Sequence, residues 1–150
     1  MNQTRQSASP EQTRAIVTEI GGGLRGGDVV LLSGDLGAGK TELTKGIAVG
    51  LGVTDLVQSP TFALVDEHPA PILGPAGRLV HLDLYRLGAD ELDGIGWDDL
   101  IASEGDVVVV EWAERAAERL PDHYLLIELA ITGPDSREVR VSRSGESVVP

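Results

Sequence analysis

The chain has 150 residues, 41% of them hydrophobic, and this predicts one globular domain over residues 1–150 with flexible ends at 1–8 and 145–150. Its 24 acidic and 12 basic residues give a net charge of -12, which argues against tight direct binding to a nucleic-acid backbone. There is no cysteine to form disulfides or thiolate metal sites, and no apolar run approaches the ~20 residues of a membrane span, so we expect a cytoplasmic protein.

The first third of the chain alternates helix and strand patterns. Ser-Pro-Glu-Gln at 9–12 is typical of a capped helix start, and apolar residues recur at helical spacing until the triple glycine at 21–23. The wholly apolar run at 29–32 predicts a buried strand of a parallel sheet. Apolar residues spaced by four over 43–51 predict a second helix, which Gly52 can close.

The middle of the chain predicts two strands and short helices. Strands are predicted at 61–65 and 79–84, and the flexible, Pro- and Gly-rich segment 69–77 between them suits an antiparallel pairing. Residues 90–101 predict one or two short helices, broken near two glycines.

The last third returns to a buried strand. The apolar run at 107–110 predicts that strand, and 112–120 predicts a helix that a proline stops. Strands at 124–131 and 138–142 flank a turn. Together these elements predict a three-layer α/β fold of the P-loop NTPase type, with a mixed, mainly parallel central sheet and antiparallel additions.

Residues 34–41, Gly-Asp-Leu-Gly-Ala-Gly-Lys-Thr, match the P-loop pattern between a predicted strand and a predicted helix. Glycines let the backbone curl so that amide hydrogens converge on nucleotide phosphates, and the helix N-terminus adds partial positive charge. The Lys40 ammonium can reach the β- and γ-phosphates, and the Thr41 hydroxyl can ligate Mg2+. The predicted nucleotide-binding residues of the loop are Asp35, Leu36, Gly37, Ala38, Gly39, Lys40 and Thr41.

A P-loop enzyme needs an acidic residue at the end of a neighbouring buried strand, and Glu111 follows the run at 107–110. Its alternative role is to favour the start of the next helix.

Asp83 is the rival acid. Strand alternation places it on one face with His81, as a metal-binding pair or a hydrogen-bonded core pair, and Asp83 could instead orient the attacking water. Arg86 could stabilise charge in the active site or form an ion pair at the surface, and we prefer the surface ion pair.

Four motifs occur in order: the P-loop, Ser-Pro-Thr-Phe at 59–62, His-Leu-Asp-Leu-Tyr-Arg at 81–86 and Val-Glu-Trp-Ala-Glu at 110–114. Together they resemble the TsaE family, the bacterial ATPase of tRNA threonylcarbamoyladenosine biosynthesis, over residues 9–142. The resemblance implies ATP with Mg2+, and hydrolysis that is slow without partners. It also implies a threonylcarbamoyl transferase pair, of TsaD and TsaB type subunits, which ATP hydrolysis resets between rounds. tRNA would be met indirectly, through the complex.

The resemblance also assigns roles by position. It implies Lys40, Asp83 and Glu111 as catalytic residues, with Glu111 and Thr41 as magnesium ligands. It places Thr13 near the adenine end of the nucleotide. It matches Arg137 to a late arginine of uncertain role, which we include among the nucleotide-binding residues. One departure is Glu42, where the family often has a second threonine.

Two alternatives stay open. A small-molecule or nucleoside kinase usually carries a mobile lid with several arginines, and here only the segment 66–78, which is not Arg-rich, could serve as one. A non-hydrolysing module whose nucleotide gates assembly is the other alternative. The complete set of Lys40, Thr41, Asp83 and Glu111 favours catalysis.

Overall fold

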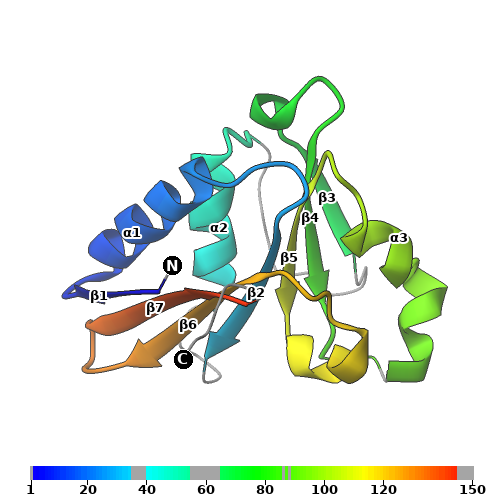
Figure 1. Ribbon diagram of the computed structural model, residues 1–150. Coiled ribbons are helices and arrows are strands. Elements are labelled where there is room, and N and C mark those ends of the chain that lie inside the picture. The colour runs from blue at the N-terminus through cyan, green and yellow to red at the C-terminus, as the bar shows by residue number, and fades with distance from the viewer. Residues whose placement is uncertain (1, 35–39, 55–64, 86, 88, 145–150) are drawn as a thin grey trace.

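The computed structural model describes residues 2–34, 40–54, 65–85, 87 and 89–144. The described strands form one seven-stranded sheet in the order β1-β7-β6-β2-β5-β4-β3 (Figure 1). In chain order they are β1 (Gln3–Ser7), β2 (Val29–Gly34), β3 (Val65–Pro69), β4 (Arg78–Asp83), β5 (Val107–Glu111), β6 (Leu125–Ile131) and β7 (Arg137–Arg143).

The four central strands, β6, β2, β5 and β4, are parallel, whereas β1, β7 and β3 each pair antiparallel to a neighbour. The mixed, mainly parallel sheet with antiparallel additions is therefore confirmed.

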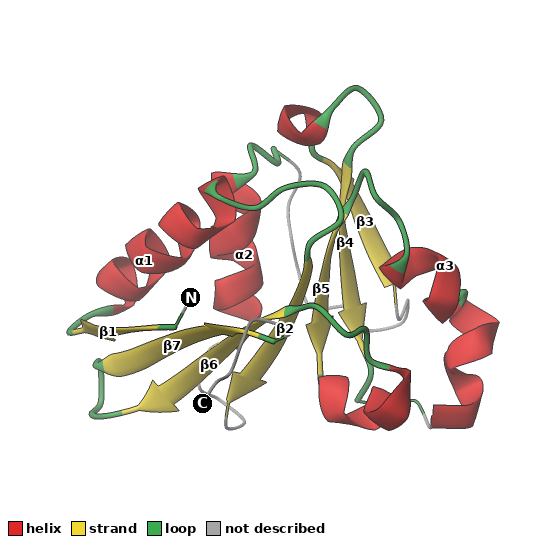
Figure 2. Ribbon diagram, viewed as in Figure 1, coloured by secondary structure: helices red, strands yellow, loops and turns green. Residues whose placement is uncertain are grey.

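Helices cover both faces of this sheet (Figure 2). On one face lie α1 (Pro10–Gly22) and α2 (Lys40–Gly50). On the other lie α3 (Trp97–Ile101) and two 3-10 helices, η2 (Ala89–Ile95) and η3 (Ala113–Arg119). Each face has its own hydrophobic core, and β5 contributes to both, because its side chains alternate between the two faces. This explains why a central parallel strand reads as an unbroken apolar run.

Helix α1 begins as its sequence predicts. Ser9 is the N-cap and its Oγ accepts a hydrogen bond from the Gln12 N–H at 3.1 Å, while Pro10 occupies the first turn. The Gln12 side chain reaches back to accept the Ala8 N–H at 2.7 Å. The side chains thus satisfy two amide hydrogens at this end, one from the first turn and one from the residue before the cap. None of the helices in the described ranges is long and apolar enough to cross a membrane.

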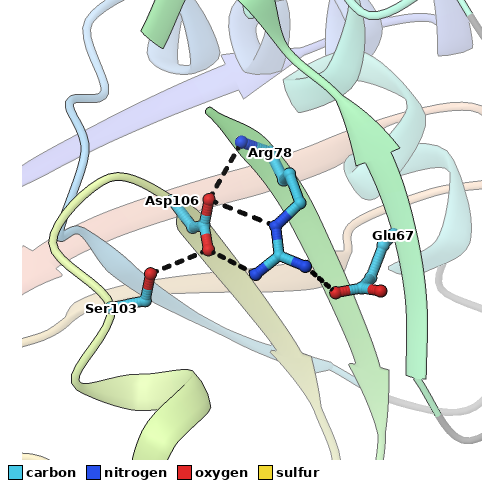
Figure 3. A network of polar contacts seen from close by, with 4 residues as sticks. All are labelled: Glu67, Arg78, Ser103 and Asp106. Carbon is cyan, nitrogen blue, oxygen red and sulfur yellow. Dashed lines mark hydrogen bonds and ion pairs between the residues drawn. The ribbon is translucent and has the colours of Figure 1, made fainter. Parts of the chain in front are cut away.

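At the edge where β4 and β5 begin, a polar network joins β3, β4 and the loop before β5 (Figure 3). Asp106 precedes β5 and accepts hydrogen bonds from the Arg78 backbone at 3.0 Å, from the Arg78 guanidinium at 2.8 Å and from the Ser103 hydroxyl at 2.8 Å. Arg78 also pairs with Glu67 of β3. Burial by itself would raise the pKa of Asp106, but these hydrogen bonds outweigh it and hold the pKa below its usual value.

The structure corrects two predictions. Residues 3–7, predicted to be flexible, form β1 along the free edge of β7. The helix predicted over 112–120 is the 3-10 helix η3, preceded by Trp112 with a left-handed φ of 59°.

The connection between β3 and β4 also takes a definite form. Residues 69–77 contain a short 3-10 helix, η1 (Pro71–Leu73), and the Ala70 N–H donates to the Gly77 carbonyl at 2.9 Å. The predicted antiparallel pairing of the two strands is confirmed, but the first strand lies at 65–69. The part of the predicted strand at 61–64 lies outside the described residues.

Candidate nucleotide site at the C-terminal edge of the sheet

The central parallel strands all end at one edge of the sheet, and the predicted site residues gather there. The register aligns Leu32 of β2 with Glu111 of β5, and Glu111 with Asp83 of β4. Two acidic residues from segments far apart in sequence thus end adjacent strands side by side. This is the edge at which open α/β sheets bind ligands.

The predicted P-loop at 34–41 begins at this same edge. β2 ends at Gly34 and α2 begins at Lys40, so the strand and the helix predicted on either side of the P-loop are confirmed. The loop residues Asp35, Leu36, Gly37, Ala38 and Gly39 lie outside the described residues, as does the Ser-Pro-Thr-Phe motif at 59–62. Of Lys40 and Thr41 the structure describes the helical backbone.

Glu111 is the last residue of β5 and only 4% exposed. Its Oε2 lies 2.5 Å from Nε2 of His81, and its backbone carbonyl accepts the Leu84 N–H at 3.1 Å. The predicted position, at the C-terminal end of a buried strand, is confirmed. A buried carboxylate needs a hydrogen-bond partner, and the His81 ring lies within hydrogen-bond distance of it.

His81 and Asp83 share a face of β4, as alternation predicts, but the described contacts give them different partners. His81 is fully buried, contacts Glu111, and lies 3.5 Å from the hydroxyl of the equally buried Thr44 on α2. The half-buried Asp83 accepts the Tyr85 N–H at 3.0 Å. The core pair of His81 with Asp83, considered from the sequence, is not among these contacts, and His81 contacts Glu111 instead. Sequence reasoning missed Thr44, whose only signal was a threonine among the apolar positions of its helix.

The donor set suits Mg2+ better than a softer metal. Within the described ranges, no group of three or more His, Asp or Glu side chains could hold a metal by itself. Magnesium, however, is usually bound by one or two carboxylates together with phosphate oxygens and water. Glu111 and Asp83 provide carboxylate oxygens at adjacent strand ends. These residues therefore fit a magnesium ion that reaches the site with a nucleotide.

Glu42, the departure from the family pattern, lies in the first turn of α2 and forms a small ion cluster. Its carboxylate contacts the Lys45 ammonium at 3.0 Å and the Arg14 guanidinium of α1 at 3.0 Å. The hydrogen bond from Lys45 holds the pKa of Glu42 below its usual value, and Arg14 adds to the effect. The negative charge that Glu42 adds next to the P-loop is thus balanced locally.

An aromatic group lies just beyond the two acids. The Tyr85 and Trp112 rings are 4.8 Å apart between centroids, and the Arg115 guanidinium lies 5.7 Å from the Tyr85 centroid. Tyr85 is 51% exposed, and it follows Asp83 by two residues while Trp112 follows Glu111 by one. The two motifs that end β4 and β5 therefore also meet through their aromatic residues.

Thr13 and Arg137 lie on the other side of the P-loop strand. The Thr13 hydroxyl contacts Ser7 and donates to the Ser9 carbonyl at 3.2 Å. Ser7 in turn pairs with Arg137 across β1 and β7. Arg137 donates to the carbonyls of Gly133 and Ser136 in the turn after β6, at 3.0 and 2.8 Å. Both predicted residues thus lie near the C-terminal end of β6, on the opposite side of β2 from Glu111 and Asp83.

A pocket of about 180 Å³ opens beside the end of β2, between that strand and β6. Its lining residues are Ser33, Gly34, Glu128, Leu129, Ala130 and Arg140. It places an open surface next to the start of the predicted P-loop, where β2 borders β6.

Comparison with known proteins gives a consistent family. The model of the family described as "Threonylcarbamoyl adenosine biosynthesis protein TsaE" matches residues 7–139. The tRNA threonylcarbamoyladenosine biosynthesis protein TsaE of Bacillus subtilis is 41% identical over 140 residues, covering 93% of this chain and 85% of the relative. The protein of the same name from Streptomyces coelicolor is 43% identical over 129 residues, covering 82% and 84%.

A solved structure agrees with these relatives. The crystal structure of Bacillus subtilis YdiB superposes with a TM-score of 0.78 at 35% identity, covering 96% of this chain and 86% of that one. The chain belongs to the TsaE family of threonylcarbamoyl adenosine biosynthesis proteins.

Proposed function

We propose that the chain binds ATP with Mg2+ and hydrolyses it, and that this cycle resets a threonylcarbamoyl transferase during tRNA N6-threonylcarbamoyladenosine modification. The observation that carries the proposal is the meeting of three features at one sheet edge: the strand and helix that flank the P-loop sequence, buried Glu111 and adjacent Asp83. The names of the relatives support the pathway, since they place those proteins in tRNA threonylcarbamoyladenosine biosynthesis.

Each residue has a proposed role. The loop amides and Lys40 hold the β- and γ-phosphates, while Thr41 and Glu111 hold the magnesium ion. When bound, magnesium neutralises charge on these phosphates. Asp83, or a residue of a partner, orients the water that attacks the γ-phosphorus in line.

Thr13 and Arg137 lie on the far side of β2 and are proposed to contact the remainder of the nucleotide.

The proposed partners are a transferase pair of TsaD and TsaB type subunits, with tRNA met through the complex. The acidic chain supports this division, because its net charge of -12 opposes direct binding to a phosphate backbone. A contribution from the partners to the transition state would make turnover slow in the isolated chain, as in NTPases that receive an arginine in trans.

The test is ATP turnover with Mg2+, measured for the chain alone and after addition of the transferase pair and tRNA. We expect a low basal rate that rises when the partners are added. Lys40→Ala should lower the stimulated rate on the order of 10²-fold, the usual cost of removing one transition-state donor. Unchanged turnover on addition of the partners would contradict the proposed role, and full turnover by Lys40→Ala would contradict the assigned phosphate site.

A further inference from the structure

We propose that His81 is a positioning residue that fixes the carboxylate of Glu111, so that one oxygen is held inside the fold and the other is presented to the metal. The inference rests on the proposed function, in which Glu111 is a magnesium ligand. It assigns a role to a buried histidine that the proposed reaction does not otherwise use.

The geometry of the contact gives its direction. An ionised carboxylate only accepts hydrogen bonds, so the 2.5 Å contact between Glu111 Oε2 and His81 Nε2 requires the proton on Nε2. The other ring nitrogen, Nδ1, is buried and has no hydrogen-bond partner among the described residues. A buried N–H without an acceptor is rarer in proteins than an acceptor left unpaired. The tautomer that carries its proton on Nε2 and none on Nδ1 therefore agrees with both observations, the contact of Nε2 with Glu111 and the absence of a described partner for Nδ1.

The location of His81 separates positioning from catalysis. The ring is fully buried and its Nε2 contacts Glu111 at the end of β5, so the role that this geometry assigns to it acts through Glu111. Its Nε2 also lies 3.5 Å from the hydroxyl of Thr44, in the helix that begins at the P-loop. The His81 ring therefore lies between Glu111, at the end of β5, and Thr44, in the helix that follows the predicted phosphate loop.

A rigid Glu111 would matter for metal affinity. A glutamate side chain has several rotatable bonds, and a free one must lose that freedom when it binds an ion. Holding Oε2 with a hydrogen bond removes this cost in advance and leaves Oε1 for the ligand. Partners that orient metal ligands in this way typically change metal affinity by about 10–100-fold when they are removed.

The experiment compares His81→Gln with His81→Asn. A glutamine can place its amide N–H near the Nε2 position, whereas the shorter asparagine cannot reach it. We measure Mn2+ affinity by electron paramagnetic resonance with a non-hydrolysable ATP analogue bound, and analogue affinity without metal. His81→Asn should weaken Mn2+ binding by about 10-fold or more. His81→Gln should retain most of it, and both variants should bind the analogue alone as the wild type does.

Controls separate this inference from the function on which it rests. If Glu111→Gln weakens Mn2+ binding but the folded His81→Asn protein does not, the inference is overturned while the metal assignment stands. If Glu111→Gln has no effect, the metal assignment fails and the inference fails with it. A thermal melt of each variant shows whether it is folded.

A second measurement uses the wild-type protein, so it does not depend on whether a variant folds. In ¹⁵N NMR of the wild type, the His81 signals should show a protonated Nε2 and an unprotonated Nδ1. A proton on Nδ1 with Nε2 bare would overturn the inference, because Nε2 could not then donate to Glu111.

Discussion

Among single residues, Asp106 accepts hydrogen bonds from the Arg78 backbone, the Arg78 guanidinium and the Ser103 hydroxyl, at the sheet edge opposite the candidate site. We expect Asp106→Asn to lower the free energy of unfolding at pH 7 by about 1–3 kcal/mol, because it weakens hydrogen bonds to a buried acceptor. Urea unfolding measures the change. The exposed Asp122→Asn is the matched control and should change stability by less than about 0.5 kcal/mol.

Asp106 should also make the free energy of unfolding depend on pH. The pKa of Asp106 is lowered in the folded state, so its contribution to stability is present above the unfolded value of about 3.9 and is lost as pH falls through the folded pKa. The difference in unfolding free energy between wild type and Asp106→Asn should therefore narrow in acid. A difference that stays constant from pH 7 to pH 2 would contradict the assigned charge interaction.

The candidate site shows how far single residues could be predicted. The positions of Glu111 and Asp83 followed from the sequence, since each ends a strand-like segment and parallel strands end at one edge. The partner of His81 did not follow. Strand alternation gives a face but not the register between strands. The register places Asp83 opposite Glu111, and the His81 side chain reaches Glu111 diagonally, from the position opposite Val109.

Among the elements, the contact between α1 and α2 depends on glycine. A Cβ at Gly21 would lie 2.6 Å from the Ile47 carbonyl oxygen and 2.8 Å from its Cα, which are both backbone atoms. We expect Gly21→Ala to destabilise the protein by roughly 1–3 kcal/mol through overpacking, despite the better helix propensity of alanine. Thermal or urea unfolding measures the effect.

The neighbouring glycine gives a matched control in the same helix. A Cβ at Gly22 would meet only the Gly50 carbonyl oxygen, at an ordinary 3.7 Å. Gly22→Ala should therefore be neutral or stabilising by up to about 1 kcal/mol. Equal destabilisation by Gly21→Ala and Gly22→Ala would mean that the close approach of the two helices is not the cause.

One element was predicted wrongly, and for another the helix was predicted but not its 3-10 type, for different physical reasons. β1 has the sequence Gln-Thr-Arg-Gln-Ser, without apolar alternation, and it forms because β7 offers a free edge, which no local pattern reveals. In η3 the buried residues Ala113 and Ala116 are three apart. That spacing suits a 3-10 helix, in which residues i and i+3 lie above one another, as well as an α-helix. Tertiary contacts therefore decide which forms.

For the whole molecule, the two ends of the central parallel strands have different roles. The C-terminal strand ends carry the candidate site, and the opposite edge carries the Asp106 network, which joins β4 to the start of β5. The sequence predicted the first of these roles, because wholly apolar runs indicate central parallel strands and parallel strands fix the edge that binds ligands. It did not predict the Asp106 network.

The charge of the whole molecule leads to a prediction about tRNA. Of the 12 basic residues, six already form ion pairs with carboxylates within the described part of the chain. They are Arg5, Arg14, Lys45, Arg78, Arg119 and Arg140. Binding to a phosphate backbone needs clustered cations that release counterions. With a net charge of -12, we expect the isolated chain to show no saturable binding to tRNA at physiological salt.

Fluorescence anisotropy of labelled tRNA tests this, first with the chain alone and then with the chain added to the transferase pair. The pair alone is the positive control for a competent tRNA. In the proposed complex, the acidic chain should reach tRNA only through its partners, so its own addition should raise the anisotropy only when they are present. Saturable binding of the isolated chain that weakens steeply with salt would reveal a basic surface that the ion pairs do not neutralise, and tRNA would then be a direct ligand.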